Sequence, residues 1–160
     1  MGGKLRIAVG SDQAGFEYKE TIKNTLKTSP YVAEVIDLGV DSNQNSKPYP
    51  YIGIKAGECI SLGEVDRAVL ICGTGLGVGM SAGKVPGIRA VTAHDSFSVE
   101  RSILSNNCHV LSMGQRVVGI ELAKRLALEW VSYTFDEKSP SAEKVKVLRE
   151  YERKLLDGNF

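Results

Sequence analysis

Short apolar runs alternate along the chain with longer segments in which apolar residues recur at helical spacing. The apolar runs predict strands over 4–10, 33–39, 67–73, 88–94 and 108–114. The segments between and after them predict helices over 14–28, 51–63, 77–85, 95–107, 119–135 and 142–156, the last of them strongly charged. The polar segment 42–50 contains two prolines and predicts a loop.

This alternation is typical of an α/β protein with a five-stranded parallel sheet, helices on both faces and right-handed crossovers. No repeat, low-complexity tract or long linker divides the chain, so we expect one domain over 1–160 with a C-terminal helix. In such a sheet, ligands bind beyond the carboxyl ends of the strands. The residues that follow each strand are therefore the first candidates for a site.

Composition excludes several other classes of function. The chain has 160 residues, of which 42% are hydrophobic, and its formal charge of +1 gives no basic surface for nucleic acid or an anionic membrane. Three cysteines without CxxC spacing argue against a disulfide framework or a zinc site, so we expect no metal. Because no apolar run has the length of a signal peptide or a membrane span, we expect a cytoplasmic protein.

Chemistry-bearing residues follow three of the predicted strands. Asp12 and Gln13 follow the first strand, Cys72 ends the third, and His94 follows the fourth. For His94, a place in the capping region of a helix and a role in the site are equally open, since Asp95 or Ser96 would cap the next helix. The segment "SNNCH", residues 105–109, precedes the fifth strand at the opposite end, where only a neighbouring subunit would bring it to the site.

The glycine-rich segment after the third strand, "CGTGLGVGMSAGK", allows three interpretations. Glycine can simply permit tight packing between a strand and a helix. Dinucleotide binding would need GxGxxG, but glycines at 73 and 75 are followed by Val78 in the third place, and no Walker motif is present. In the third interpretation, backbone N–H groups of residues 73–77, the glycine loop, hold an oxyanion or a phosphate.

The position of Cys72 favours the third interpretation, in which the glycine loop holds an oxyanion. A free cysteine is commonly a core residue. Beside converging N–H dipoles, however, a thiol ionises more easily and can accept a proton from carbon while the same N–H groups stabilise the developing oxyanion. The other cysteines, Cys59 within a helix and Cys108 at the start of a strand, lack that setting and are expected to be packing residues.

Taken together, "RIAVGSDQAGF", "CGTGLGVGMSAGKVPGIRA" and "HDSFSVERSILSNNCHVLSMGQRVVG" resemble the type B ribose-5-phosphate isomerases and the related galactose-6-phosphate isomerase subunits. The resemblance runs in order over residues 4–150. It implies a Rossmann-like three-layer α/β/α sandwich, no cofactor or metal, and a homodimer or larger assembly. It also implies aldose–ketose isomerisation of a sugar phosphate through a cis-enediolate, with ribose 5-phosphate as the family's default substrate.

The resemblance implies a role for individual residues as well. Cys72 would be the base that moves the proton between C1 and C2, and Asp12 would bind the sugar and assist ring opening. Substrate-binding residues would further include Gln13, Tyr49 at the site wall, and Asn106 and Arg116, which match positions typically contributed by the partner subunit. Thr74 and the N–H groups of the glycine loop would stabilise the enediolate, which involves Gly73, Gly75, Leu76 and Gly77.

The sequence departs from the family in residues that select the substrate. Gln13 replaces a histidine, Ser105 replaces the histidine that opens the sugar ring, and Gly83 replaces an asparagine. The two C-terminal phosphate-binding arginines have no clean match, and only Lys144 retains a cationic character there. Serine is a poor general acid, and loss of bidentate arginines weakens recognition of a phosphate dianion.

These departures leave several substrates open. A four-carbon sugar phosphate, which needs no ring opening, would tolerate the loss of the histidine, and a sugar without phosphate would tolerate the loss of the arginines. A protein that binds a sugar or an anion without turning it over is a further alternative. The apolar stripe of the helix over 142–156 fits equally well against a partner in a dimer or against its own subunit.

Overall fold

The computed structural model describes residues 3–158. Its strands are β1 (Leu5–Ser11), β2 (Val32–Asp37), β3 (Arg67–Cys72), β4 (Ala90–Thr92) and β5 (Val110–Gly114). Its helices are the short 3₁₀ turn η1 (Gln13–Gly15), α1 (Phe16–Leu26), α2 (Tyr49–Ser61), α3 (Leu76–Ala82), α4 (Ser96–Leu104), α5 (Ile120–Ser132) and α6 (Ser141–Leu156).

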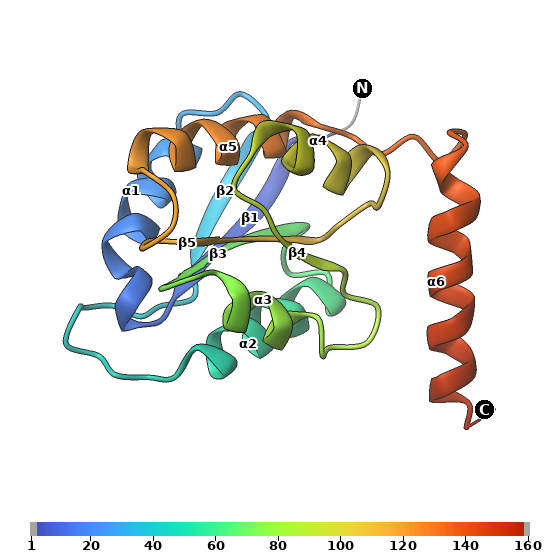
Figure 1. Ribbon diagram of the computed structural model, residues 1–160, viewed down its shortest axis with the longest axis horizontal. Coiled ribbons are helices and arrows are strands. Elements are labelled where there is room, and N and C mark those ends of the chain that lie inside the picture. Colours follow the sequence, from blue (N-terminus) through green and yellow to red (C-terminus); the bar gives the residue numbers. More distant parts are fainter. Residues whose placement is uncertain (1–2, 159–160) are drawn as a thin grey trace.

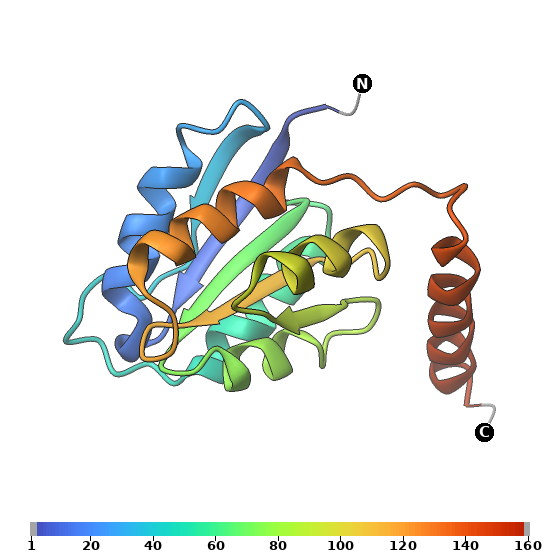
Figure 2. The same ribbon diagram turned by 45° about the horizontal axis from the view of Figure 1, so that its top comes forward.

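The strands form one parallel sheet in the order β2-β1-β3-β5-β4. Figure 2 shows their arrowheads pointing to one edge of the sheet. The predicted α/β class and the five-stranded parallel sheet are therefore confirmed. Because β1 and β5 flank β3, the segments that follow these three strands meet at the centre of that edge.

Helices cover both faces of the sheet, so that the body has three layers (Figure 1). On one face, β-strand side chains such as Val69 and Ile71 pack against α1, α4 and α5, with Trp130 fully buried among them. On the other face, Leu70 and Cys72 join the apolar side chains of α2 and α3. The alternation of side chains along β3 thus directs Cys72 toward the α2–α3 layer.

Several element boundaries differ from the predicted ones. Tyr49 is the first residue of α2 and does not lie in the preceding loop, because Pro48 stands at the N-cap and Pro50 occupies the first turn, where proline costs no hydrogen bond. The edge strand β4 is limited to three residues. Before it, the backbone N–H of Arg89 donates to the Nδ1 atom of His109 rather than to a neighbouring strand.

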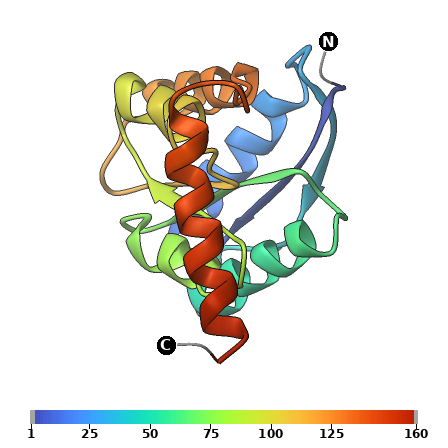
Figure 3. The same cartoon turned by 90° about the vertical axis from the view of Figure 1, so that its right-hand side faces the viewer.

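The C-terminal helix α6 stands beside the three-layer body, as Figures 1 and 2 show, and Figure 3 shows it spanning from the level of α5 to that of α2 and α3. Glu152 accepts a hydrogen bond from the Gly87 N–H at 2.7 Å, whereas Val145 is the buried residue of the helix. Leu148 and Tyr151, which continue the predicted apolar stripe, are more than half exposed. The stripe is therefore divided: Val145 packs on its own subunit, whereas Leu148 and Tyr151 are left exposed.

Candidate active site

The third strand ends in Cys72, a thiol that is 4% exposed. Its Sγ accepts a hydrogen bond from the backbone N–H of Gly75 at 3.0 Å. Gly75 adopts a left-handed conformation with φ of 81°, and a Cβ at this position would lie 2.7 Å from the backbone of Met113. Only glycine fits both conditions, so the sequence of the loop is what turns an N–H group toward the thiol.

The rest of the glycine loop is shaped by close contacts with α2. A Cβ on Gly77 would lie 2.5 Å from the ring of Tyr49, so that the tyrosine ring packs directly on the loop. Thr74 and Leu76 are exposed, and the Leu76 N–H donates to the Thr74 hydroxyl at 3.3 Å. Tyr49 therefore packs against the glycine loop, and its role in the wall of the site stays a prediction.

A turn after β5 closes the other side of the site. Gly114 pairs with Cys72 in the sheet, and the next two N–H groups, of Gln115 and Arg116, donate to the carbonyl groups of Cys72 and Gly73 at 2.9 and 3.0 Å. The Arg116 guanidinium lies so near that a Cβ on Gly73 would be 3.3 Å from its Nη1 atom.

This position corrects the expectation that the partner subunit contributes Arg116. The arginine reaches the glycine loop of its own chain, because β5 lies next to β3 in the sheet. That neighbourhood is set by the order of the strands and cannot be derived from their positions in the sequence.

Asp12, which follows β1, lies on the third side of the site. Its Oδ1 accepts a hydrogen bond from the Gly15 N–H at 3.2 Å. Burial raises the pKa of this carboxyl, and the N–H groups of Gly15 and Ala14 and the charge of Arg116 only partly offset that effect. A carboxyl with a raised pKa near the thiol is suited to exchange a proton with a substrate hydroxyl.

A hollow of about 470 Å³ opens beside Arg116. Gln13 donates from its Nε2 atom to the carbonyl oxygen of Asn43 at 2.6 Å, which ties the loop before α2 to the rim of this hollow. We refer to this space as the Arg116 hollow. Its lining residues are Gln13, Ala14, Glu17, Asn43, Gln115 and Arg116. Three of these residues, Glu17, Asn43 and Gln115, were not predicted, since a helix face and two loops of ordinary composition carry no signal for them.

Three predicted residues lie away from this site. Ser105 and Asn106 follow α4 and precede β5, which places them at the amino end of the sheet. The Asn106 carbonyl accepts a hydrogen bond from the Nε atom of Arg89 at 3.1 Å. Lys144 is exposed on α6. None of the three can reach Cys72 of the same chain, as expected for Ser105 and Asn106 from their position before the fifth strand.

His94 is a residue whose role the sequence left open. Asp95 takes the capping role, because its Oδ1 accepts the N–H of Ser98 at 2.7 Å. The His94 ring turns instead toward β5, and its Nε2 atom accepts the N–H of Gly114 at 2.8 Å. The feature of the sequence that could have identified His94 as part of this region is its position after the fourth strand.

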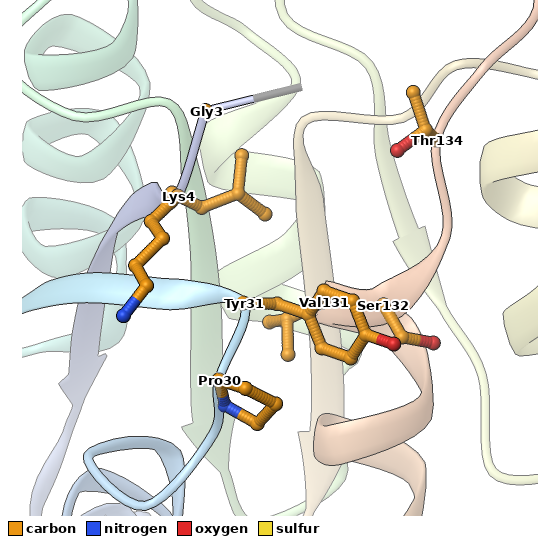
Figure 4. Close-up of a pocket in the computed structure, with 8 residues that line it drawn as sticks. Gly3, Lys4, Pro30, Tyr31, Val131, Ser132 and Thr134 are labelled. Carbon is orange, nitrogen blue, oxygen red and sulfur yellow. The ribbon is translucent and has the colours of Figure 1, made fainter. Parts of the chain in front are cut away.

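A second cavity, of about 360 Å³, lies at the amino end of β1 (Figure 4). Lys4 and Tyr31 line it with apolar and small side chains, and Figure 4 shows the lysine amine pointing away from the tyrosine hydroxyl. Its lining holds no carboxylate, thiol or imidazole. This cavity is therefore a poorer candidate for proton transfer than the Cys72 end of the sheet.

Within residues 3–158, no group of three or more histidine, cysteine, aspartate or glutamate side chains is arranged to hold a metal ion. In the same part of the chain, no helix combines the length and the apolar character that a bilayer span requires.

Comparisons with known proteins identify the family. The model of the Ribose/Galactose Isomerase family matches residues 7–148. The chain is 53% identical to D-erythrulose-4-phosphate isomerase 2 of Mycolicibacterium smegmatis, over 92% of this chain and 97% of that protein, and 38% identical to ribose-5-phosphate isomerase B of Escherichia coli, over 82% and 86%. It superimposes on the ribose-5-phosphate isomerase B of Clostridium thermocellum with a TM-score of 0.86 and 39% identity, over 94% and 99% of the two chains.

Proposed function

On the premise that this chain belongs to the ribose/galactose isomerase family and is an aldose–ketose isomerase, we propose that it interconverts D-erythrulose 4-phosphate and D-erythrose 4-phosphate. The family model covers residues 7–148 and thus spans every element from β1 to the first half of α6. The observation that carries the reaction is the Cys72 thiol at the end of β3 with the Gly75 N–H directed at its sulfur.

The reaction is a proton transfer between neighbouring carbons. The Cys72 thiolate removes a proton from C1 of the ketose, and the electron pair of the C–H bond forms the C1–C2 double bond of an enediolate. The charge moves to the C2 oxygen, which the loop with Thr74 holds. A proton then passes from the C1 hydroxyl to the C2 oxygen, for which Asp12 is placed, while the thiol returns its proton to C2.

The phosphate is assigned to the Arg116 hollow. Arg116 supplies a cation that is always charged, and it both lines the hollow and lies beside Gly73 of the glycine loop. Glu17 also lines the hollow and its carboxylate repels a dianion, so we place the phosphate on the Arg116 guanidinium.

The number of carbons that we propose for the substrate follows from the residues that replace the family's histidines. Ribose 5-phosphate closes a furanose ring through its C4 hydroxyl, so its isomerase must open the ring. In a four-carbon 4-phosphate, that oxygen carries the phosphate and no such ring forms. Ser105 and Gln13, which cannot serve as neutral-pH general acids, are compatible with the open-chain substrate. The 53% identity to a D-erythrulose-4-phosphate isomerase supports the same choice.

The test is proton NMR in heavy water with a panel of four- to six-carbon aldoses and ketoses, each with and without phosphate. We expect the four-carbon 4-phosphates to be converted with a kcat/KM at least tenfold above that of ribose 5-phosphate. A preference for ribose 5-phosphate would overturn the four-carbon assignment and leave the isomerase intact. Conversion of unphosphorylated sugars alone would overturn the role of the Arg116 hollow.

A single substitution sharpens the substrate assignment. Ser105→His restores the residue type of the family and is expected to raise turnover of ribose 5-phosphate while turnover of D-erythrulose 4-phosphate stays within about twofold. Ser105→Asn is the matched control, since it adds a polar side chain without a titratable nitrogen. Equal effects of both variants on both substrates would contradict a ring-opening role for this position.

We also propose a homodimer in which one chain brings residues 105 and 106 to the Cys72 end of the other. Support comes from their position at the amino end of the sheet and from the exposed apolar side chains Leu148 and Tyr151 of α6. After Cys72→Ala and Asn106→Ala chains are mixed and exchanged, dimers with one intact site are expected to recover activity that neither variant has alone. No recovery in proven mixed dimers would exclude a shared site.

A further inference from the structure

His94 stands where β4 ends, outside the set of groups assigned to the reaction. Its Nε2 atom accepts the backbone N–H of Gly114 at 2.8 Å. A ring nitrogen accepts a hydrogen bond only when it carries no proton, so the contact requires the neutral ring with its proton on Nδ1.

Gly114 is the point at which three parts of the active site meet. It pairs with Cys72 in the sheet, and a Cβ on it would lie 2.6 Å from the backbone of Thr74. The N–H groups of Gln115 and Arg116, the next residues, hold the carbonyl groups of Cys72 and Gly73. The hydrogen bond from Gly114 to His94 therefore fixes a residue on which the thiol, the glycine loop and the arginine all depend.

A second contact from the same strand reaches the loop. The Thr92 hydroxyl, two residues before His94, donates to the Gly75 carbonyl at 3.2 Å and shares a hydrogen bond of 2.8 Å with Ser112. The Thr92 hydroxyl thus holds the Gly75 carbonyl with a group that does not titrate near neutral pH. Of the two residues that hold this region, His94 is the one whose side chain titrates.

We propose that His94 is a positioning residue whose neutral ring holds Gly114, and through it the Arg116 turn and the glycine loop, in the geometry that catalysis requires. Protonation of the ring converts Nε2 into a donor that faces another donor, so the Gly114 contact is lost and turnover falls. This inference rests on the proposed isomerase activity, but the state of the Gly114 contact can be measured without substrate.

The surroundings of the ring set the pH at which this happens. Burial lowers the pKa of His94 below its usual 6.5, and Asp95, the charged group beside the ring, opposes that effect by favouring the proton. Cys72 and Arg116 are the titratable or charged groups at the neighbouring strand ends, on β3 and after β5. The ring is therefore neutral at pH 7 and above, and the contact is expected to be released in mildly acidic solution.

Two variants separate the proposed role from simple packing. His94→Gln keeps an oxygen acceptor within reach of the Gly114 N–H and removes the titration, whereas His94→Leu leaves the N–H without an acceptor. With D-erythrulose 4-phosphate at pH 7.5, we expect the first variant to retain kcat within about threefold and the second to lose roughly tenfold.

The pH profile gives the sharper readout. Wild-type kcat/KM is expected to fall in acid with a component that His94→Gln lacks, while the contribution of the substrate phosphate and of Asp12 remains in both proteins. Identical acid limbs in the two proteins would overturn the proposal, and so would a His94→Leu enzyme with unchanged kcat.

The decisive experiment follows the ring and its partner directly in the substrate-free protein. The chain has two histidines, so the ring signals in a two-dimensional NMR spectrum are assigned by comparison with His94→Gln. We expect the Gly114 amide signal to shift with the same midpoint as the His94 ring. A Gly114 amide that stays unchanged while the ring titrates would overturn the proposal even if the substrate assignment holds. If no sugar phosphate is turned over, the Gly114 titration still decides whether the contact is pH-dependent.

Discussion

Each end of the parallel sheet carries a buried cysteine, and the two thiols have opposite chemical settings. Cys72 at the carboxyl end is 4% exposed and receives the N–H of Gly75. Cys108 at the amino end is 6% exposed, and burial raises the pKa of its thiol to about 11 although Arg89 and Arg67 favour the thiolate. Burial disfavours the thiolate of Cys108, and the N–H group directed at the Cys72 sulfur is the structural difference on which the proposed role of Cys72 rests.

The arginines of the two ends show the same contrast. At the amino end, Arg67 donates to the carbonyl groups of Trp130 and Tyr133, and Arg89 donates to the Asn107 carbonyl at 2.7 Å. At the carboxyl end, Arg116 is exposed beside its hollow. Arginines whose N–H groups are taken up by the chain's own carbonyl groups stabilise the fold, whereas an exposed one beside a hollow is available to a ligand.

The largest expected effect comes from comparing two glycines with positive φ, Gly75 at the carboxyl end of the sheet and Gly63 at the amino end. Gly75→Ala forces a left-handed alanine against the Met113 backbone, so we expect at least a hundredfold loss of kcat and a destabilisation of about 2–4 kcal/mol. Gly63, which precedes β3 at the amino end, has φ of 71° and open space around it. Gly63→Ala is the matched control and should cost only about 1–2 kcal/mol with unchanged kcat. Denaturant unfolding and steady-state kinetics of both variants measure this difference, and equal kinetic losses would refute it.

The second comparison exchanges an arginine for methionine at either end. Arg116→Met is expected to raise KM for the sugar phosphate by roughly 10- to 100-fold with little change in stability, because it removes a charged hydrogen-bond donor to the ligand. Arg67→Met should leave KM unchanged and cost about 1–3 kcal/mol of stability, since the Trp130 and Tyr133 carbonyl groups lose their donors. A raised KM with Arg67→Met and an unchanged KM with Arg116→Met would contradict the proposal that the ligand binds at the carboxyl end of the sheet.

The smallest expected effect concerns acid stability at the amino end. Burial, with the charges of Arg89, Arg149 and Arg67, lowers the pKa of His109 from 6.5 to about 4. The folded ring is therefore neutral, and its contribution to stability is complete above pH 6.5 and is lost as the pH falls toward 4, because the unfolded chain binds the proton first. His109→Asn keeps an acceptor for the Arg89 N–H and should reduce the loss of unfolding free energy between pH 7 and 4.5 by about 1–2 kcal/mol. Parallel loss in both proteins would speak against this titration.

The sequence predicted the parts of the molecule that depend on local patterns. Apolar runs located the strands, and the order of strands and helices indicated a parallel sheet whose carboxyl ends carry the site. The glycine pattern marked the loop at Cys72, because a left-handed residue next to a packed backbone can only be glycine.

What the sequence could not predict depends on which strands are neighbours. Arg116 reaches its own glycine loop, and His94 reaches Gly114, because β5 inserts between β3 and β4. No local pattern contains that order. The stripe of α6 likewise identifies an apolar face without saying which surface covers it.

The central claim is that proton transfer takes place at Cys72, and deuterium incorporation tests it most directly. D-erythrulose 4-phosphate is incubated in heavy water with Cys72→Ala and, as matched control, with Cys108→Ala, and exchange at C1 is followed by NMR. We predict that Cys72→Ala slows exchange by a factor on the order of 10³ while keeping the fold, and that Cys108→Ala exchanges at nearly the wild-type rate. Wild-type exchange by a folded Cys72→Ala enzyme would contradict the account.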